Sequence, residues 1–303
     1  MTTAARPPAD RTIFRAIRAP CTILAIGALL SLLARAAAAD GPSEEAFGKK
    51  EAEVRKVIGA FASGFEVRRV GPFVVVSDLP AAALDRVCKG SIEGCRAALA
   101  RQFFATAPDR PTAIYLLAEA ETYEAFCLHR TGRRPSTPYG FYRREQGEII
   151  CDVSTGTGTL VHEMVHALMA PDFPKVPAWM NEGLGSLFEQ CGFREGELRG
   201  LPNWRLAGLK KTIAAGSLRS LHDLMGLDDD AFYGRDSGVN YAHARYFLLY
   251  LQERGELRDF YRAYRDGFAD DATGRAALAA ATGEGPAAHE KRFRAFVDGL
   301  RFP

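Results

Sequence analysis

The sequence predicts an α+β fold, with a small sheet in a mixed N-terminal lobe and a helical C-terminal lobe. The order of the predicted elements and the length of the chain support this. Up to Asp152, short β-rich runs alternate with helical patterns, whereas after Glu189 the pattern is almost wholly helical. Strands followed by helices, rather than strict alternation, are typical of α+β proteins. A further observation is length, because the roughly 264 residues that follow an N-terminal leader are enough for a substantial core.

The N-terminal lobe is expected over residues 40–155. Strands are predicted where β-branched and apolar residues run together, and helices where charged and apolar residues recur at helical spacing. In order, we expect a helix over 44–60, a strand over 73–77, helix over 80–106, a strand over 112–117 and a short helix over 120–128. A hairpin follows, with strands at 140–143 and 148–152 on either side of Arg144–Gly147.

The hairpin leads directly into the first helix of a region that we assign to residues 156–303. This helix has apolar side chains nearly all round, so it is expected to be buried, and Pro171 and Pro174 end it. Pro177 then opens a second helix. Later helices are predicted at about 203–215, 218–225, 239–254, 256–267, 272–281 and 286–300.

The buried helix carries the most informative motif, His162-Glu163-x-x-His166. Residues four apart lie on one helical face, so the two imidazoles can bind one metal ion. Glu182, from the next helix, offers an oxygen ligand and leaves a fourth position for water, while Glu163 can reach that water without being a ligand. Two histidines and a glutamate around an open position predict a catalytic zinc site. The competing interpretation is a pair of core histidines without a metal.

The segments HEMVHALM and PAWMNEGLGSLFE resemble the gluzincin clan of metallopeptidases, most closely the peptidase MA-like group with its W-x-N-E-G second motif. The resemblance covers residues 139–190 and, more weakly, 239–251. It implies that His162, His166 and Glu182 bind zinc, that Glu163 is the general base, and that a zincin-like cleft separates the two lobes.

One position departs from the pattern of this family. Relatives often carry an aspartate one turn after the ligand glutamate, where it holds a ligand histidine, but here that position is Ser186. The contact that orients a ligand histidine is therefore expected to be weaker or to come from elsewhere, with Glu189 and Asn181 as candidates.

The oxyanion of a hydrolytic intermediate needs a hydrogen-bond donor besides zinc. The resemblance points to a tyrosine near the start of the helix over 239–250, which is Tyr241, and His243 is the competing candidate. The alternative is that Tyr241, Tyr246 and Tyr250 form an aromatic stripe that only packs this helix against its neighbours.

The first 39 residues are typical of a signal peptide. Four arginines precede the apolar run Cys21–Ala34, and the small residues Ala36–Ala39 suit cleavage before Asp40. An uncleaved membrane anchor is the alternative, although the run is short for a bilayer span. The leader carries five arginines and one aspartate, so the chain's net charge of +2 falls to −2 without it. We therefore expect a secreted or periplasmic protein that does not bind nucleic acid.

Five cysteines follow the leader, and an oxidising compartment would favour disulfides among them. We expect Cys88–Cys95 first and Cys127–Cys151 second, which leaves Cys191 free, although connectivity is not fixed by sequence. A zinc–thiolate site is not expected because the chain has no C-x-x-C pair.

Together these features predict an exported zinc peptidase that hydrolyses peptide or protein substrates with an activated water. A substrate could pair as an added strand with either strand of the 140–152 hairpin, although the hairpin could equally just close the sheet. Two other functions stay open: a catalytically idle zinc-bearing binding domain at the cell envelope, and a zinc hydrolase that acts on a non-peptide amide.

Overall fold

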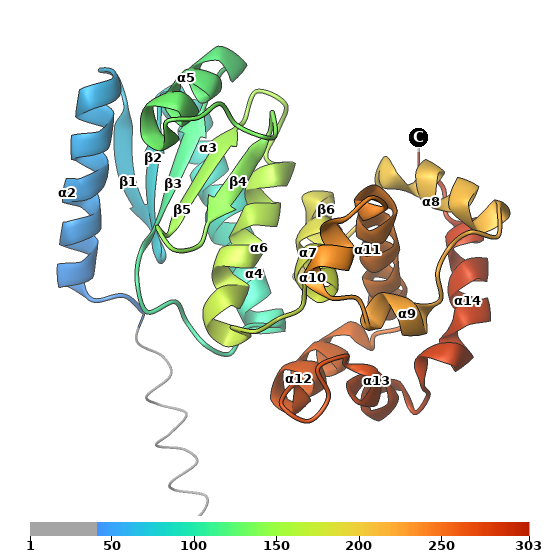
Figure 1. Cartoon of the computed structure of the whole chain (residues 1–303). Helices are drawn as coiled ribbons and strands as arrows, with labels where there is room; N and C mark the ends of the chain where they lie inside the picture. The colour runs from blue at the N-terminus through green and yellow to red at the C-terminus, as the bar shows by residue number, and fades with distance from the viewer. Residues whose placement is uncertain (1–40, 303) are drawn as a thin grey trace, which may run out of the picture. The chain divides into compact units, whose positions relative to one another are not determined.

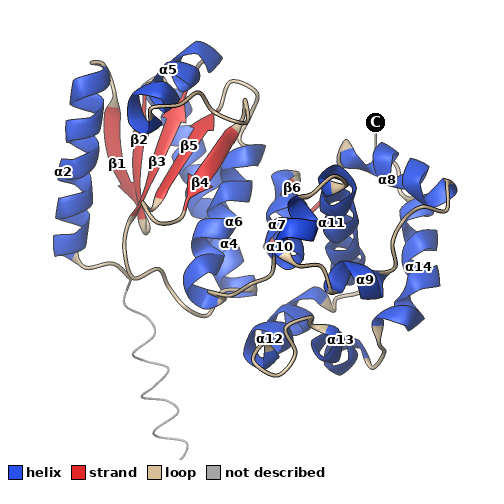
Figure 2. Cartoon of the chain, viewed as in Figure 1, coloured by secondary structure: helices blue, strands red, loops and turns tan. Residues whose placement is uncertain are grey.

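The first half of the chain builds a five-stranded mixed sheet in a computed structural model that describes residues 41–302 (Figures 1 and 2). The predicted leader therefore lies outside the described residues. The strand order is β1-β2-β3-β5-β4, with β1 Glu66–Val70, β2 Phe73–Ser77, β3 Thr112–Leu117, β4 Gly140–Arg143 and β5 Glu148–Asp152. The three inner strands are parallel, and the two edge strands β1 and β4 run antiparallel to their neighbours.

The inner strands are buried along their whole length, as expected for parallel strands with both faces covered. Alternate residues serve opposite faces. Val74 and Val76 pack with α2 (Glu44–Phe61) and α5 (Ala120–Thr131), whereas Phe73 and Val75 belong to the core shared with the other helices. That second core continues into α6 (Gly158–Asp172), the helix that carries the metal-binding motif.

The helix expected over 80–106 is divided into three consecutive pieces. These are α3 (Ala81–Arg86), a π-helix η1 (Val87–Gly94) and α4 (Cys95–Gln102). The π-helical piece contains Gly90 and Gly94, and glycine relaxes the backbone restriction that keeps an α-helix regular.

After α6 the chain is largely helical, which confirms the predicted α+β class (Figure 2). The helices are α7 (Ala178–Glu189), α8 (Arg205–Ala214), α9 (Leu221–Met225), α10 (Asp229–Tyr233), α11 (Ser237–Glu253), α12 (Leu257–Gly267), α13 (Arg275–Thr282) and α14 (Pro286–Gly299). No helix within residues 41–302 has both the length and the apolarity needed to cross a membrane.

The expectation of helices alone after Glu189 was wrong in one place. A two-stranded antiparallel hairpin, β6 (Cys191–Arg194) and β7 (Glu197–Gly200), follows α7 directly. Its two-residue turn has positive φ at Glu195 (53°) and Gly196 (79°), which is the turn geometry that matches the twist of a tight hairpin.

Helix α7 packs between the motif helix α6 and the long helix α11. Gly183 makes the approach to α11 close, because a Cβ at this position would lie 3.1 Å from Leu248 Cδ1. The far end of α6 is fixed by Asp172, whose carboxylate accepts hydrogen bonds from Tyr261 Oη at 2.9 Å and from Arg265 Nη1 at 3.1 Å. These contacts hold the two histidine-bearing turns of α6 between the sheet and the C-terminal helices.

The two predicted disulfides were wrong, because all five cysteines of the described residues are free thiols. Cys88 and Cys95 lie seven residues apart along one continuous helical segment, so the rise of the helix separates them along its axis. Cys127 and Cys151 pack on opposite faces of the sheet. Cys191 is a free thiol, which confirms the expectation for this residue.

Candidate metal centre

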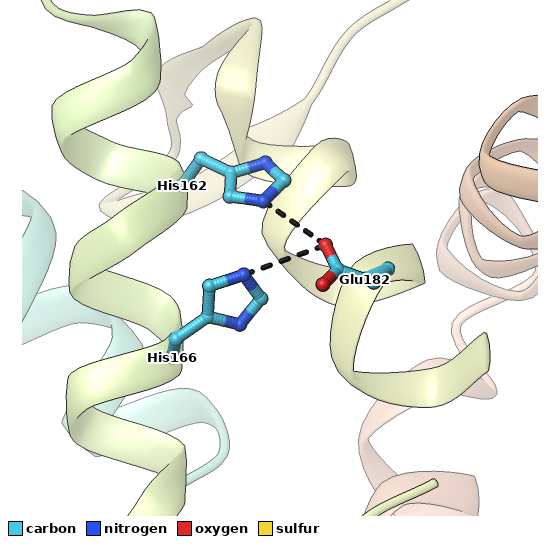
Figure 3. Close-up of side chains that lie close together, drawn as sticks. All are labelled: His162, His166 and Glu182. Atoms are coloured by element: carbon cyan, nitrogen blue, oxygen red, sulfur yellow. Dashed lines mark hydrogen bonds and ion pairs between the residues drawn. The ribbon is translucent and has the colours of Figure 1, made fainter. Parts of the chain in front are cut away.

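Three side chains of α6 and α7 converge on one point. His162 and His166 lie on the same face of α6, and the carboxylate of Glu182 reaches between them from α7 (Figure 3). Glu182 Oε2 is 3.2 Å from His162 Nε2 and 3.5 Å from His166 Nε2. All three ligand atoms lie within 4.8 Å of one another, so they could hold a single metal ion. The predicted ligand set is therefore brought together by the fold.

The cluster forms part of the wall of a cavity of about 410 Å³. Glu182 is only 7% exposed, and Glu163, which lies beside the histidines on α6, is 9% exposed and lines the same cavity. The remaining lining residues come from both halves of the chain and are Phe141, Tyr142, Arg144, Ala170, Val176, Ala178, Asn181, Asp229, Tyr233 and Tyr241. A ligand in this cavity would therefore meet the sheet edge, the histidine helix and the C-terminal helices together.

Asn181 decides which nitrogen of His166 faces the cluster. Its Oδ1 lies 2.9 Å from His166 Nδ1, so that nitrogen carries the proton and donates it to the amide oxygen. The other ring nitrogen, Nε2, faces the Glu182 carboxylate, 3.5 Å away. A proton on Nε2 or a metal ion between the two groups stabilises this approach. The donor set therefore fits a divalent metal with nitrogen and oxygen ligands, of which zinc is the usual one.

The pKa values of the cluster lead to the same conclusion. Burial lowers the pKa of His166, but the charge of Glu182 and its hydrogen bond outweigh burial and raise the pKa to about 9. Burial also acts to raise the pKa of Glu182, and the two histidines more than offset it, so that this pKa lies well below its usual range. The site thus favours a positive charge beside a permanently ionised carboxylate.

Tyr233 is a member of the site that the sequence analysis missed. Its hydroxyl donates a hydrogen bond of 2.6 Å to Glu182 Oε1, while Oε2 faces the histidines. It belongs to α10, a single short turn that Asp229 attaches to the start of α7 by accepting from Ala178 N at 3.1 Å. Burial and the neighbouring carboxylate raise the pKa of Tyr233, which keeps it a proton donor.

The two candidates for oxyanion donor have different surroundings. Tyr241 lines the cavity, and burial together with the charge of Glu182 raises its pKa. His243 does not line the cavity; it is fully buried against Phe293, with ring centroids 5.4 Å apart. Residues two apart on a helix face in different directions, so only one of the two could face the metal centre. The His243 hypothesis was therefore wrong.

The contacts also show which side chain orients His166 when position 186 is a serine. Ser186 Oγ is buried without a hydrogen-bond partner among the described residues. Glu189 does not reach the histidines, because its Oε2 accepts from Arg205 Nε at 3.4 Å and Asn203 Nδ2 at 3.3 Å. Asn181 is thus the residue that orients His166, which confirms one of the two alternatives.

Gly185 allows α7 to approach α6 closely enough for the cluster to form. A Cβ at Gly185 would lie 3.1 Å from both His162 Nε2 and His166 Cε1. Because these are ring atoms of the two proposed ligands, any side chain here would press directly on the metal-binding face. A glycine at position 185 is therefore required by the packing of the metal site itself.

The β4–β5 hairpin has the predicted strands, and β4 is the edge strand. Phe141 and Tyr142 of β4 and the adjacent Arg144 line the cavity beside the histidines. No described strand pairs with the outer edge of β4.

Comparison with known proteins adds no family, because no protein-family model matches the chain and no curated protein matches it.

Proposed function

We propose that this chain is a zinc-dependent metallopeptidase that is exported from the cell. The observation that carries the proposal is the convergence of His162, His166 and Glu182 within 4.8 Å, in a cavity that also contains the non-ligand Glu163. When bound to two histidines and a glutamate, zinc supplies a Lewis acid that polarises a carbonyl group and activates water.

Glu163 is the proposed general base. It accepts the proton of the attacking water and delivers it to the nitrogen of the leaving amine. Its place on α6 supports this role, since it lines the cavity next to both histidines without belonging to the cluster of ligand atoms. Tyr241 is the proposed donor to the oxyanion, because its hydroxyl keeps its proton in the same cavity.

The proposed substrate is an extended peptide that pairs with β4. An edge strand offers main-chain donors and acceptors that bind peptides without reading their sequence. The proximity of Phe141 and Tyr142 to the metal cluster would bring the scissile bond of such a peptide to Glu163. The leader expected at residues 1–39 supports the proposed export.

The alternative from another class is an idle zinc-bearing binding domain at the cell envelope. The retention of Glu163 argues against it, because a purely structural or binding zinc site has no chemical need for a carboxylate that is not a ligand. A zinc hydrolase of non-peptide amides would use the same residues, so only the substrate distinguishes it.

Turnover of a broad peptide library by zinc-loaded protein tests the proposal. We expect wild type to cleave peptides internally and Glu163→Gln to lose at least about 10²-fold in rate, since general-base catalysis contributes 10²–10⁴-fold. Glu124→Gln, the same change at a glutamate whose side chain is 54% exposed and does not line the cavity, serves as the control.

Each outcome selects one function. Zinc binding without any peptide turnover favours the binding domain, and turnover restricted to non-peptide amides favours the third function. Peptide cleavage that persists at the wild-type rate in Glu163→Gln would exclude Glu163 as the base.

A further inference from the structure

A second cavity, of about 500 Å³, adjoins the cavity of the metal centre. Tyr142, Arg144 and Ala170 line both cavities, so the two spaces meet at these residues. The other walls of the second cavity come from residues between 106 and 112, just before and at the start of β3, and from the last turns of α6. A peptide bound at the metal centre therefore has a second space into which it can extend.

One face of α6 lines both cavities. Ala167 follows Glu163 by four residues and Ala170 follows His166 by four, so each alanine lies next to a residue of the metal centre along this face. The alanine side chains end at Cβ, which leaves open the space that a larger side chain would fill. The surface that carries the proposed base thus continues into the second cavity.

Two arginines line the second cavity, and backbone carbonyl groups hold both of them in place. Arg144 Nη2 donates to Pro174 O at 3.0 Å, which attaches the turn of the β4–β5 hairpin to the loop between α6 and α7. Arg110 donates to Glu145 O at 3.0 Å and to Arg144 O at 2.6 Å. A guanidinium group has five N–H donors, so these bonds leave donors on both side chains for a ligand.

The described residues do not neutralise the positive charge of this cavity. Within residues 41–302 neither Arg110 nor Arg144 forms an ion pair, whereas the neighbouring Arg143 is paired with the buried Glu148 at 2.8 Å. Among the described lining residues, Asp109 is the one carboxylate, so two arginines against one aspartate leave one positive charge. The second cavity is therefore suited to an anionic group.

We propose that Arg110 and Arg144 form a subsite for a carboxylate of the peptide substrate, carried by an acidic side chain or by the C-terminus. A guanidinium group binds a carboxylate through paired N–H···O bonds that a neutral side chain cannot reproduce. A peptide strand that pairs with β4 reaches Arg144 directly after β4 ends at Arg143. This inference rests on the proposed peptidase function and adds the feature of the substrate that the enzyme selects.

Peptides that differ only in charge test the proposal. One set of neutral, amide-capped peptides carries glutamate at one position at a time, and the matched set carries glutamine there. Fluorescence anisotropy of labelled peptides measures binding to Glu163→Gln with zinc present, and mass spectrometry measures cleavage by wild type. At low ionic strength we expect glutamate at one position to give about 10-fold tighter binding and about 10-fold higher kcat/KM, and added salt to reduce both gains.

The same peptides with a free C-terminus distinguish the two sources of the carboxylate. A gain from an internal glutamate in amide-capped peptides assigns the subsite to an acidic side chain. A gain that needs the free C-terminus assigns it to the terminal carboxylate, and cleavage should then remove residues from that end of the peptide.

Matched variants test the two arginines. Arg110→Gln and Arg144→Gln, each combined with Glu163→Gln for binding, should lower the 10-fold gain to about 3-fold, because each removes one of the two charges. Arg144→Glu should instead make lysine the preferred residue at that position. Arg101→Gln is the control, since Arg101 is also exposed and donates to a carbonyl, Gly196 O at 3.4 Å, but lines neither cavity.

Binding decides the subsite separately from catalysis. If wild type cleaves no peptide, the peptidase function is contradicted, while tighter binding of the carboxylate peptides still supports the subsite. The subsite is overturned if peptides with and without the carboxylate bind equally, or if the gain is unchanged in both arginine variants. Loss of the gain in Arg101→Gln would also overturn it, because a general effect of surface charge would then explain the preference.

Discussion

At the scale of single residues, the two carboxylate oxygens of Glu182 have different partners. Its Oε2 faces His162 Nε2 at 3.2 Å, while Oε1 accepts the 2.6 Å hydrogen bond from Tyr233. The tyrosine thus fixes the rotation of the carboxylate and directs one oxygen at the histidines. Partners of this kind orient metal ligands and contribute to affinity although they never touch the metal.

Replacing Tyr233 by phenylalanine should therefore weaken zinc binding while the ligands stay in place. We expect the dissociation constant to rise about 10-fold or more, since loss of such partners costs 10–100-fold in metal affinity. Competition with a chromophoric chelator measures the constant. Tyr139→Phe, at a tyrosine that is 52% exposed and does not line the cavity, is the control. Equal affinity in the two variants would show that Tyr233 does not position Glu182.

At the scale of elements, the metal centre depends on how closely α7 approaches α6. Gly183 and Gly185 alternate along α7, and each faces a different neighbour. A Cβ at Gly183 would meet Leu248 of α11 at 3.1 Å, and one at Gly185 would meet the rings of His162 and His166 at the same distance. The position of α7, which supplies the third ligand, thus depends on the absence of a side chain at both glycines.

Gly185→Ala should push α7 away from the histidines and lower zinc affinity, although alanine is the better helix former. The added methyl group lies only 3.1 Å from ring atoms of both ligands, so we expect at least a 10-fold rise in the zinc dissociation constant. Isothermal titration of metal-free protein with zinc gives the value. Gly208→Ala on α8, where a Cβ would meet nothing within 4 Å, should bind zinc as wild type does.

The sequence allowed the strongly patterned elements to be predicted and missed those that depend on tertiary contacts. The two histidines on α6 were readable because helical spacing places them on one face, and Glu182 on α7 was implied by the resemblance of its segment to a second zinc-binding motif. Strand β1 was missed because three of its five residues are charged, and β6–β7 because its apolar residues are few. The turn Glu195-Gly196 was the available signal for that hairpin.

One member of the site could not be predicted for a different reason. Tyr233 lies 51 positions after Glu182, on a five-residue helix whose position is set by its contact with Ala178. This contact has no local sequence pattern, so only the assembled fold brings Tyr233 to Glu182.

At the scale of the whole molecule, His243 makes stability depend on pH. It is fully buried on α11, and neither ring nitrogen has a hydrogen-bond partner among residues 41–302. Burial, assisted by the charges of Arg294 and Arg219, lowers its pKa to about 3. In the unfolded chain the histidine pKa is near ~6.5, so below that pH His243 binds a proton in the unfolded state but not in the folded state. The stabilisation is complete above pH ~6.5 and is lost as the pH falls toward about 3.

His243→Leu should remove this part of the acid sensitivity. Between pH 7 and pH 4.5 we expect wild type to lose roughly 2–3 kcal/mol more of its free energy of unfolding than the variant. Urea unfolding at several pH values, with a chelator present in every sample, gives the difference without a contribution from bound metal. His222→Ala, a change at an exposed histidine, should keep the wild-type slope, and a leucine variant with that same slope would contradict the account.

The zinc content of purified protein tests the central claim most directly. Inductively coupled plasma mass spectrometry of wild type, Glu182→Ala and Glu163→Gln compares two glutamates of the same cavity, one a proposed ligand and the other the proposed base. The account predicts about one zinc per chain in wild type and in Glu163→Gln, and most of it lost in Glu182→Ala. Folded wild type without zinc, or equal loss of zinc in both variants, would contradict the metal centre.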